Sequence, residues 1–383
     1  MAKSGEWWVD NQQRALSNNS VCYTERPDMG IFMKEWLSLY ESKSGERGIF
    51  NRASAQVKAA SNGRRDGDIE FGTNPCCEII LRPYQFCNLS EVICRVDDTM
   101  DTLKNKIKLA TILGTFQSTL TDFGYIRKRW KNTTEEERLL GVSLTGIMDC
   151  PAVYDASPEA LRQLRDVAIK TNKKLAEKLG INQSTAVTCV KPSGTVSQLV
   201  DAASGIHARH NPYYIRTVRG DNKDPLTMFL QDKGVPSEPD FTAPDNVTVF
   251  SFPMKSPDSA VCRYDMGALA QLELWLKIAD NYCEHKPSVT ISVQEHEWLE
   301  VGAWCWEHFD SLSGISFLPF SDHSYKQAPY QDIDKEEFKD LTKKMPPAID
   351  WYELSNYEKG DTTTGSQELA CAGGVCEIVD IGA

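Results

Sequence analysis

The sequence predicts an α/β fold built around a largely parallel sheet. In the second half of the chain, short stretches rich in β-branched and aromatic residues alternate with amphipathic helical patterns, which is typical of α/β cores. The composition, 41% hydrophobic and 25% charged over 383 residues, is ordinary for a globular protein with a sizeable core. The chain contains no internal repeat and no long low-complexity linker, so the pattern does not favour a repeat architecture.

The first 150 residues predict three helices separated by loops. Residues 1–30 are polar and rich in turn-forming residues, and 31–40 follow with apolar residues at helical spacing. A long amphipathic helix is expected over 99–123 and another helix over 135–148. The inward face of the long helix would carry apolar residues at steps of three and four: Leu103, Ile107, Ala110, Leu113, Phe116, Leu120 and Phe123.

The helix expected over 157–180 has the clearest end signals. Ser157 can cap its N-terminus, Pro158 suits its first turn, and Gly180 can end it. Its inward face would consist of Leu161, Leu164, Ala168, Leu175 and Leu179.

Five strands are expected in the remainder of the chain. They lie at 185–190, 213–219, 247–252, 288–293 and 315–318. Helices at 266–283 and 296–309 are interleaved with the last three.

The charge pattern limits the classes of partner. The net charge is −12 and the basic residues are scattered, which argues against direct binding of duplex nucleic acid because phosphate neutralisation would be lacking. A small anionic ligand needs only a local site. No stretch has the roughly 18 apolar residues of a membrane span, and the first residues contain no apolar signal-peptide core. A cytoplasmic protein without membrane contact is therefore expected.

The sequence contains twelve cysteines. In the cytoplasm they would be reduced, so those with a function are expected to be redox or metal-binding residues rather than structural disulfides. Five cysteines stand alone in apolar or strand-like surroundings and are expected to fill the core: Cys22, Cys94, Cys150, Cys189 and Cys262.

The stretch NPCCEIILRPYQFC, which begins at Asn74 and ends at Cys87, holds the densest chemistry. In an extended segment, Asn74, Cys76 and Glu78 would point to one face, and Cys77 would point to the other. A thiol would then lie between a hydrogen-bonding amide and a potential base, and Cys87 could return to the same site. Burial of these cysteines as small hydrophobic residues is the alternative.

The segment KPSGTVSQLVDAASG, residues 191–205, is a second candidate site. A strand-to-helix turn with glycine and hydroxyl groups offers backbone N–H groups and the positive end of a helix to an anion. A plain capped turn is the alternative. Phosphate binding is expected at five consecutive residues: Ser193, Gly194, Thr195, Val196 and Ser197.

From residue 361 the chain is rich in Thr, Gly and Ser and is expected to be a mobile tail. Its CAGGVC motif holds Cys371 and Cys376, which could form a disulfide and relay reducing equivalents by thiol exchange. A zinc site is the competing interpretation. Zinc would need two further ligands from one of two pairs, Cys283 with His285 or Cys305 with His308.

These motifs together resemble ribonucleotide reductases, and especially the monomeric and phage-like adenosylcobalamin-dependent class II enzymes. The Asn-Pro-Cys-x-Glu run, with a second cysteine eleven residues after the first, is similar to their finger loop. PSGTxS is similar to their substrate-phosphate loop, and CAGGVC resembles their C-terminal shuttle cysteines. Further similar stretches, such as LLGVSLTGIMD and HKPSVTISVQEHEW, extend the resemblance over nearly all of the chain.

The resemblance implies a fold and a set of roles. Residues 1–360 would form the C-terminal portion of the catalytic barrel, the second half of a ten-stranded α/β barrel with the finger loop at 74–87 in its centre. Residues 361–383 would form a mobile redox tail. Cys76 would carry a thiyl radical that abstracts the substrate 3′ hydrogen, Glu78 would be the base for the 3′ hydroxyl, and Asn74 would hold the ribose hydroxyls. Cys87 would be one of two thiols that reduce the ribose.

The same resemblance implies the cofactor and the partners. Adenosylcobalamin would generate the radical when its cobalt–carbon bond breaks, and the substrate would be a ribonucleoside di- or triphosphate. Cys371 and Cys376 would re-reduce the active-site thiols and pass the oxidation on to thioredoxin or a similar protein.

Two departures from the family qualify this hypothesis. The family holds the second active-site thiol and the specificity region far upstream of the finger loop, whereas only 75 residues precede Cys76 here. The chain is therefore expected to be the C-terminal part of a split or truncated reductase that needs an N-terminal half in trans. Cys77 stands where the family usually has a small residue. The alternative function is a non-catalytic remnant, or a thiol- or zinc-binding protein of the same fold.

Overall fold

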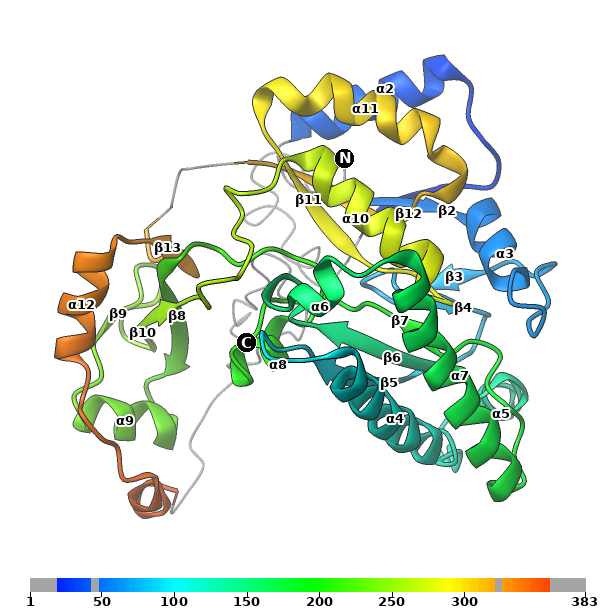
Figure 1. The fold of residues 1–383 in the computed structure, drawn as a ribbon. Helices are drawn as coiled ribbons and strands as arrows, with labels where there is room; N and C mark the ends of the chain where they lie inside the picture. The colour runs from blue at the N-terminus through cyan, green and yellow to red at the C-terminus, as the bar shows by residue number, and fades with distance from the viewer. Residues whose placement is uncertain (1–18, 43–47, 321–325, 359–383) are drawn as a thin grey trace. The chain divides into compact units, whose positions relative to one another are not determined.

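The structure, a computed structural model, describes residues 19–42, 48–320 and 326–358 (Figure 1). The chain divides into two compact units, each of which is described by itself. The first unit comprises the described residues up to Ala208, with Ser259–Val261 and Asp265–Phe320, and the second comprises the other described residues.

Three parallel strands form one sheet of the first unit. They are β5 (Asn88–Ile93), β6 (Leu140–Thr145) and β7 (Thr188–Cys189), with β6 in the middle. All six residues of β6 are buried, as expected for a parallel strand covered on both faces.

The helix predicted over 135–148 is wrong, because most of this range belongs to β6 and the segments around it. Helix α5 (Lys128–Glu137) ends where Arg138 takes a left-handed φ of 46°. The apolar run that follows is too short to distinguish a buried strand from a buried helix by its periodicity. Pairing with β5 and β7 makes it a strand.

A second sheet of the first unit has four strands. Their order is β1 (Ser20–Tyr23), β2 (Gly48–Asn51), β12 (Ser313–Pro319), β11 (Val289–Val293). Strands β11 and β12 are parallel, β1 and β2 are parallel, and β2 and β12 are antiparallel. A parallel bridge between Val190 and Pro287 joins the two sheets. The largely parallel core predicted from the sequence is therefore confirmed in this unit.

Helices α2 (Met29–Ser42), α7 (Pro158–Leu179), α10 (Ala268–Asn281) and α11 (Trp298–Glu307) confirm four helices predicted for this unit. Figure 1 shows α7 beside α4 (Met100–Gln117) and α10, and these helices cover the parallel strands. Helix α8 (Gly194–Leu199) confirms the helix expected after the strand-to-helix turn of residues 191–205. The sequence analysis did not predict several shorter elements: α3 (Arg52–Ala60), α6 (Pro151–Tyr154), β3 (Gly72–Thr73), β4 (Ile80–Leu81), η2 (Ile147–Asp149), η3 (Glu295–Glu297) and η4 (Phe309–Ser311).

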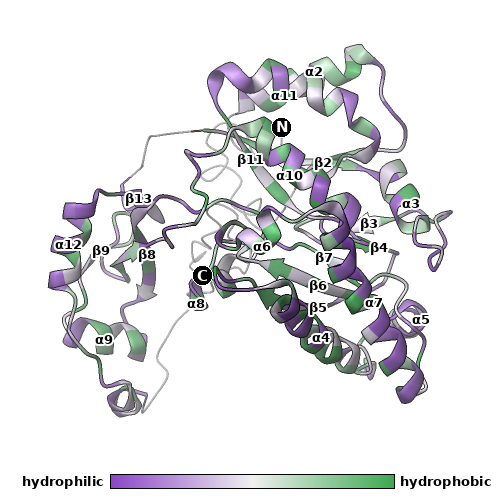
Figure 2. Cartoon of the chain, viewed as in Figure 1, coloured by the Kyte–Doolittle hydropathy of each residue, from purple (hydrophilic) through white to green (hydrophobic). Residues whose placement is uncertain are grey.

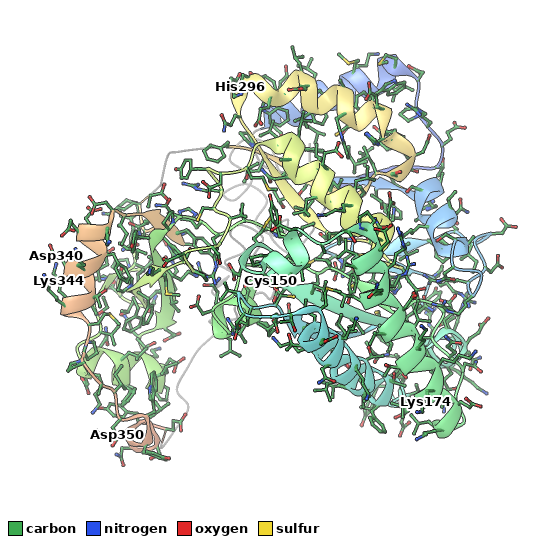
Figure 3. The ribbon with its side chains drawn as sticks, viewed as in Figure 1. Cys150, Lys174, His296, Asp340, Lys344 and Asp350 are labelled. Carbon is green, nitrogen blue, oxygen red and sulfur yellow. The ribbon has the colours of Figure 1, made fainter. Side chains whose placement is uncertain are left out.

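Helix α7 has the predicted end signals. The Ser157 hydroxyl accepts a hydrogen bond from the backbone N–H of Ala160, and Gly180 ends the helix with a left-handed φ of 66°. Lys174 projects from the exposed side of the helix (Figure 3). The predicted inward face is confirmed at Leu161, Leu164 and Ala168, but Asn172 and Ala176 then take the inward positions, and Leu179 is 37% exposed.

Helix α4 buries only the first part of its predicted apolar face. Leu103, Ile107 and Ala110 are buried, whereas the expected burial of Leu113, Phe116 and Leu120 is wrong, because they are 65%, 49% and 73% exposed. Figure 2 shows hydrophobic residues along the visible side of this helix. The strands beneath α4 contact only one side of the helix, where Gly114 packs against Leu140.

Most of the isolated cysteines fill the core as predicted. Cys94, Cys150 and Cys189 are fully buried, and Cys262 in the second unit is 4% exposed. Cys22 is exposed, contrary to the prediction, because it lies on β1 at the edge of its sheet.

The second unit contains an antiparallel sheet. Its order is β13 (Tyr330–Asp332), β8 (Tyr213–Asp221), β10 (Val247–Lys255), β9 (Ser237–Pro239). The predicted strands at 213–219 and 247–252 are present, but the expectation of parallel pairing does not hold for them. This unit also contains α9 (Pro225–Asp232), α12 (Lys335–Lys344) and η5 (Trp351–Asn356). Among the described residues, none of the helices combines the length and the apolarity that crossing a membrane requires.

Candidate active site

Residues 74–78 form a turn rather than the extended segment expected from the sequence. The Asn74 carbonyl accepts a hydrogen bond of 2.9 Å from the Cys77 N–H, and Cys77 has a left-handed φ of 65°. Pro75 favours the turn because its ring fixes φ at a value suited to the second turn position. The Asn74 Oδ1 atom accepts a further hydrogen bond from the Ile79 N–H at 3.0 Å. The alternation argument is therefore wrong for this segment.

The turn nevertheless brings three of the predicted site residues together. The Asn74 Nδ2 group donates a hydrogen bond to Glu78 Oε1 at 2.7 Å. Lys191 Nζ lies 3.2 Å from the same oxygen and 3.5 Å from Cys76 Sγ. The carboxyl of Glu78 is fully buried, whereas Cys76 is half-buried. An amide, a thiol, a carboxylate and an ammonium group thus form one cluster.

Lys191 is a member of this cluster that the sequence analysis did not single out. Burial alone would lower its pKa, but the Glu78 carboxylate and the Cys76 sulfur outweigh burial and raise it. The backbone N–H of Lys191 donates a hydrogen bond of 2.9 Å to Ser143 Oγ on β6. Its position directly before the PSGT motif was the sequence signal that could have identified Lys191 as a site residue. Its contact with Glu78 could not be predicted, because the two residues are far apart in the sequence.

The two oxygens of Glu78 have different surroundings. Oε1 accepts hydrogen bonds from Asn74 and Lys191, whereas buried Oε2 has no hydrogen-bond partner within the described residues. A buried carboxylate oxygen without a partner is costly. It is therefore a free acceptor at this site.

Cys87 interacts electrostatically with Glu78 and Lys191 of this cluster. Burial raises the pKa of its thiol, and the Glu78 carboxylate raises it further, while Arg65 and Lys191 act in the opposite direction. The thiol therefore keeps its proton at neutral pH. A protonated thiol can deliver a proton or a hydrogen atom.

Cys77 has different neighbours from Cys76. Its sulfur accepts a hydrogen bond from Thr73 Oγ1 at 3.3 Å and lies 3.9 Å from Ser20 Oγ. A side chain at Gly314 would approach the Cys77 carbonyl oxygen to 2.9 Å. The extra thiol is thus held against β1 and β12.

The predicted phosphate-binding residues form the start of α8. Thr195 lies in the first turn, Val196 is 44% exposed, and Ser197 Oγ donates a hydrogen bond to the Gly194 carbonyl at 3.0 Å. The Ser193 N–H donates to Ser204 Oγ at 2.9 Å, and the buried Ser193 side chain interacts with the Glu91 carboxyl on β5.

The redox tail cannot be placed, because Cys371 and Cys376 lie outside the described residues. Among the residues that are described, no three His, Cys, Asp or Glu side chains form a group that could hold a metal ion. Cys283 and His285, one of the pairs considered for zinc, are both fully buried.

Solved structures have the same fold as this chain. The crystal structure of a B12-dependent class II ribonucleotide reductase matches with a TM-score of 0.74 at 23% identity, over 93% of this chain and 54% of the reductase. The class Id ribonucleotide reductase alpha subunit of Actinobacillus ureae matches with a TM-score of 0.52 at 14% identity, over 83% of this chain and 64% of the subunit. The fold is therefore that of ribonucleotide reductase catalytic chains.

Sequence comparison narrows the resemblance to one class of these enzymes. Adenosylcobalamin-dependent ribonucleoside-triphosphate reductases from Lactobacillus acidophilus and Lactobacillus leichmannii are each 26% identical to this chain, over 88% and 95% of it. The enzyme of the same name from Euglena gracilis is 28% identical over 79% of the chain. These homologues confirm the class II resemblance derived from the motifs.

The chain spans about half the length of these relatives, since the matches cover 49%, 53% and 42% of them. No protein-family model matches the chain.

Proposed function

We propose that this chain carries the catalytic finger loop of an adenosylcobalamin-dependent ribonucleotide reductase, an enzyme that reduces ribonucleotides to 2′-deoxyribonucleotides for DNA synthesis. The observation that carries the proposal is the cluster of Asn74, Cys76 and Glu78, with Cys87 close enough for its thiol to respond to the Glu78 charge. The class II homologues support the choice of reaction.

The proposed roles follow from the surroundings of each group. Cys76 takes the 3′ hydrogen of the ribose, because its half-buried sulfur can be reached by both a substrate and a radical source. Glu78 Oε2 accepts the proton of the 3′ hydroxyl, since this oxygen is the free acceptor of the site. Asn74 orients Glu78 through Oε1. Cys87 supplies hydrogen as the 2′ hydroxyl leaves as water, because its thiol stays protonated.

The cofactor proposal fits the chemistry of Cys76. Adenosylcobalamin would supply one-electron chemistry at a thiol, and this thiol must be accessible from outside the chain. Cys76 follows the exposed Pro75 on a turn and is itself only half-buried. Cys76 is therefore the residue that would meet the reactive part of the cofactor.

The substrate phosphates would bind at Ser193, Gly194, Thr195, Val196 and Ser197. Backbone N–H groups at a helix start favour anions, and these residues form the start of α8. Because Lys191 belongs to the same segment, a nucleotide held here would have its ribose near Cys76 and Glu78. The relatives named above are triphosphate reductases, which favours a ribonucleoside triphosphate.

The remaining parts of the proposal concern the whole enzyme. The parallel strands of the first unit would be half of a ten-stranded barrel, completed by the segment that makes up the rest of the relatives' length. Residues 1–360 would contribute the C-terminal part of that barrel, and 361–383 would be the redox tail. Cys371 and Cys376 would pass reducing equivalents from thioredoxin or a similar cytoplasmic protein.

Deoxynucleotide formation is the direct test. The chain is incubated with adenosylcobalamin, CTP and dithiothreitol, alone and together with the upstream half of the Lactobacillus leichmannii reductase. We expect cobalamin-dependent deoxynucleotide in at least one arrangement. The Cys76→Ser variant should form none, and Glu78→Gln should lose at least about 100-fold of the rate, as expected for a general base.

The exposed Cys22 provides the matched control, because Cys22→Ser removes a thiol outside the proposed site and should leave the rate unchanged. Deoxynucleotide formation that survives Cys76→Ser would overturn the proposal. No product in either arrangement, from folded protein, would favour the non-catalytic alternative, and metal analysis would then distinguish a zinc protein from a remnant.

A further inference from the structure

The Lys191 ammonium group is a cation within the candidate site to which the proposed reaction gives no role so far. Its side chain is 31% exposed, and it contacts the fully buried Glu78 carboxylate. The same ammonium lies 3.5 Å from Cys76 Sγ. Lys191 therefore contacts both groups to which we assign chemistry.

The backbone of Lys191 is fixed on both sides. Its N–H is bound to Ser143 Oγ on β6, and its carbonyl oxygen lies against Gly205, where a Cβ atom would approach it to 2.5 Å. Gly205 has a left-handed φ of 55°, which favours glycine. The loop is thus built to hold this lysine in place between β7 and α8.

The distribution of hydrogen bonds on Glu78 gives the lysine a specific effect. Asn74 and Lys191 both bind Oε1, so the buried Oε2 is the oxygen of this carboxylate that keeps an unused acceptor. The Lys191 ammonium lies 3.2 Å from Oε1 and helps to fix its position. The carboxylate is then oriented before a substrate arrives.

We propose that Lys191 is a positioning residue of this site, which pairs with the Cys76 sulfur and one oxygen of Glu78 and leaves the other Glu78 oxygen free to accept a proton from a substrate hydroxyl. In this step the proton moves from the hydroxyl to Oε2, its bonding electrons stay on the substrate oxygen, and Lys191 remains protonated. The role in catalysis rests on the proposed function, whereas the pairing itself does not.

Other ionisable groups face this cluster from the neighbouring elements. Glu91 on β5 interacts with Lys191, and burial raises the pKa of Glu91. Cys189 on β7 and Cys87 interact with both Glu78 and Lys191, and Arg65 interacts with Cys87. None of these groups is changed in the variants below, so their contributions stay constant.

Thiol alkylation tests the pairing without requiring reductase activity. The rate of Cys76 modification by iodoacetamide is measured against pH by peptide mass spectrometry, in a Cys77→Ser background that leaves one thiol in the turn. We expect Lys191→Met to raise the apparent pKa of the Cys76 thiol by about one unit, and therefore to slow its alkylation at neutral pH about tenfold. Lys191→Arg should restore most of the reactivity, because it retains the positive charge.

Two further variants make the result specific. Glu78→Gln should accelerate Cys76 alkylation, because Lys191 then pairs with the sulfur alone. Lys106→Met removes a lysine that pairs with Asp98 at 2.6 Å, and it should leave Cys76 alkylation unchanged. If Lys191→Met does not fold, Lys191→Gln replaces it, since it also removes the charge. Identical Cys76 titrations with and without the lysine charge would overturn the proposal.

The reductase assay then tests the catalytic role separately. Without the Lys191 ammonium, Oε1 keeps only the Asn74 donor, so kcat should fall while KM changes little. Altered alkylation in a chain that forms no deoxynucleotide would support the pairing and contradict the proposed function. An unchanged kcat in an active Lys191→Met enzyme would contradict the positioning role alone.

Discussion

His285 is a buried residue whose two ring nitrogens both take part in hydrogen bonds when the imidazole is neutral. Its Nδ1 accepts a hydrogen bond from the Ile80 N–H at 3.3 Å, and its Nε2 lies 3.0 Å from the Leu140 carbonyl oxygen, to which the neutral ring can donate. Burial lowers the pKa of His285 to about 3, with a further contribution from Arg65. A second proton would remove the acceptor at Nδ1, so protonation is incompatible with the folded contacts.

Acid should therefore destabilise the protein through this residue. An unfolded histidine takes up its proton near pH 6.5, whereas the folded one does so near pH 3, so the unfolded state binds more protons between these values. Stability is fully present above pH 6.5 and falls by about 1.4 kcal/mol per pH unit below it for this one group. Urea unfolding of His285→Gln between pH 4.5 and 6.5 should show a correspondingly smaller slope than the wild type.

The exposed His296, which lies on η3 (Figure 3), provides the control. His296→Gln should keep the wild-type slope. The half-buried His207 and His210 also have pKa values lowered by desolvation, so the comparison between variants, rather than the total slope, isolates His285. Equal slopes for wild type and His285→Gln would contradict this prediction.

At the scale of elements, a bulge in β12 packs against the turn formed by residues 74–78. The register of β12 against β2 shifts between Ser313 and Ile315, and Gly314 between them has a left-handed φ of 74°. Only glycine takes this conformation readily and allows the Cys77 carbonyl to approach so closely. The bulge and the turn are therefore packed as one unit.

Gly314→Ala should destabilise the protein by more than the about 1–2 kcal/mol that a left-handed backbone costs a residue with a Cβ atom. The matched control is Gly180→Ala, because Gly180 has a similar φ of 66° but nothing within 4 Å of the added Cβ. Chemical denaturation compares the two. Cys76 alkylation should change only in Gly314→Ala, and equal effects of both substitutions on stability and alkylation would show that crowding at Cys77 is unimportant.

The helices show where local sequence information was sufficient. Helix α7 begins and ends as its cap residues indicate, since Ser157 and Gly180 act on the backbone next to them. In α4 the apolar spacing identified the helix but could not indicate which turns a neighbour covers. Leu113 continues the apolar pattern and yet is exposed, because the strands underneath reach only the other side of the helix. Leu120 is exposed beyond the end of α4 at Gln117, which comes before the end predicted at residue 123.

At the scale of the whole molecule, a buried ion pair links distant segments around the active-site turn. Arg65 binds both oxygens of Glu137 at 3.0 and 2.8 Å, and it also donates to the Ile80 carbonyl oxygen at 2.9 Å. Gln85 donates to Glu137 at 2.5 Å. The pair therefore attaches the segment between Glu78 and Cys87 to the end of α5.

Arg65→Met should cost about 3 kcal/mol of unfolding free energy, because it leaves the buried Glu137 carboxylate with only the more distant Arg82, 4.0 Å away, as a cationic partner. The control is Arg162→Met, which breaks an exposed pair with Glu159 and should cost at most about 1 kcal/mol. Urea denaturation measures both. Similar small losses for the two variants would indicate that the Arg65 pair does not fix the turn.

The sequence by itself determined the α/β class, the ends of α7, strands β7, β11 and β12 of the first unit and the composition of the candidate site. These features depend on local propensity, on periodicity or on the residue types within one short stretch. Asn74, Cys76 and Glu78 could be grouped because they are neighbours in the chain, even though the extended conformation assumed for them was wrong.

Only the tertiary structure decided which distant groups complete the site and how the apolar runs are used. Lys191 is more than a hundred residues from Cys76 in sequence, and it reaches the thiol because β7 ends beside the turn. The run from Leu140 to Thr145 is a strand because two parallel neighbours pair with it. Such contacts form only when the chain packs. The free energy of burying a side chain or pairing a charge then depends on residues that are far apart in the sequence.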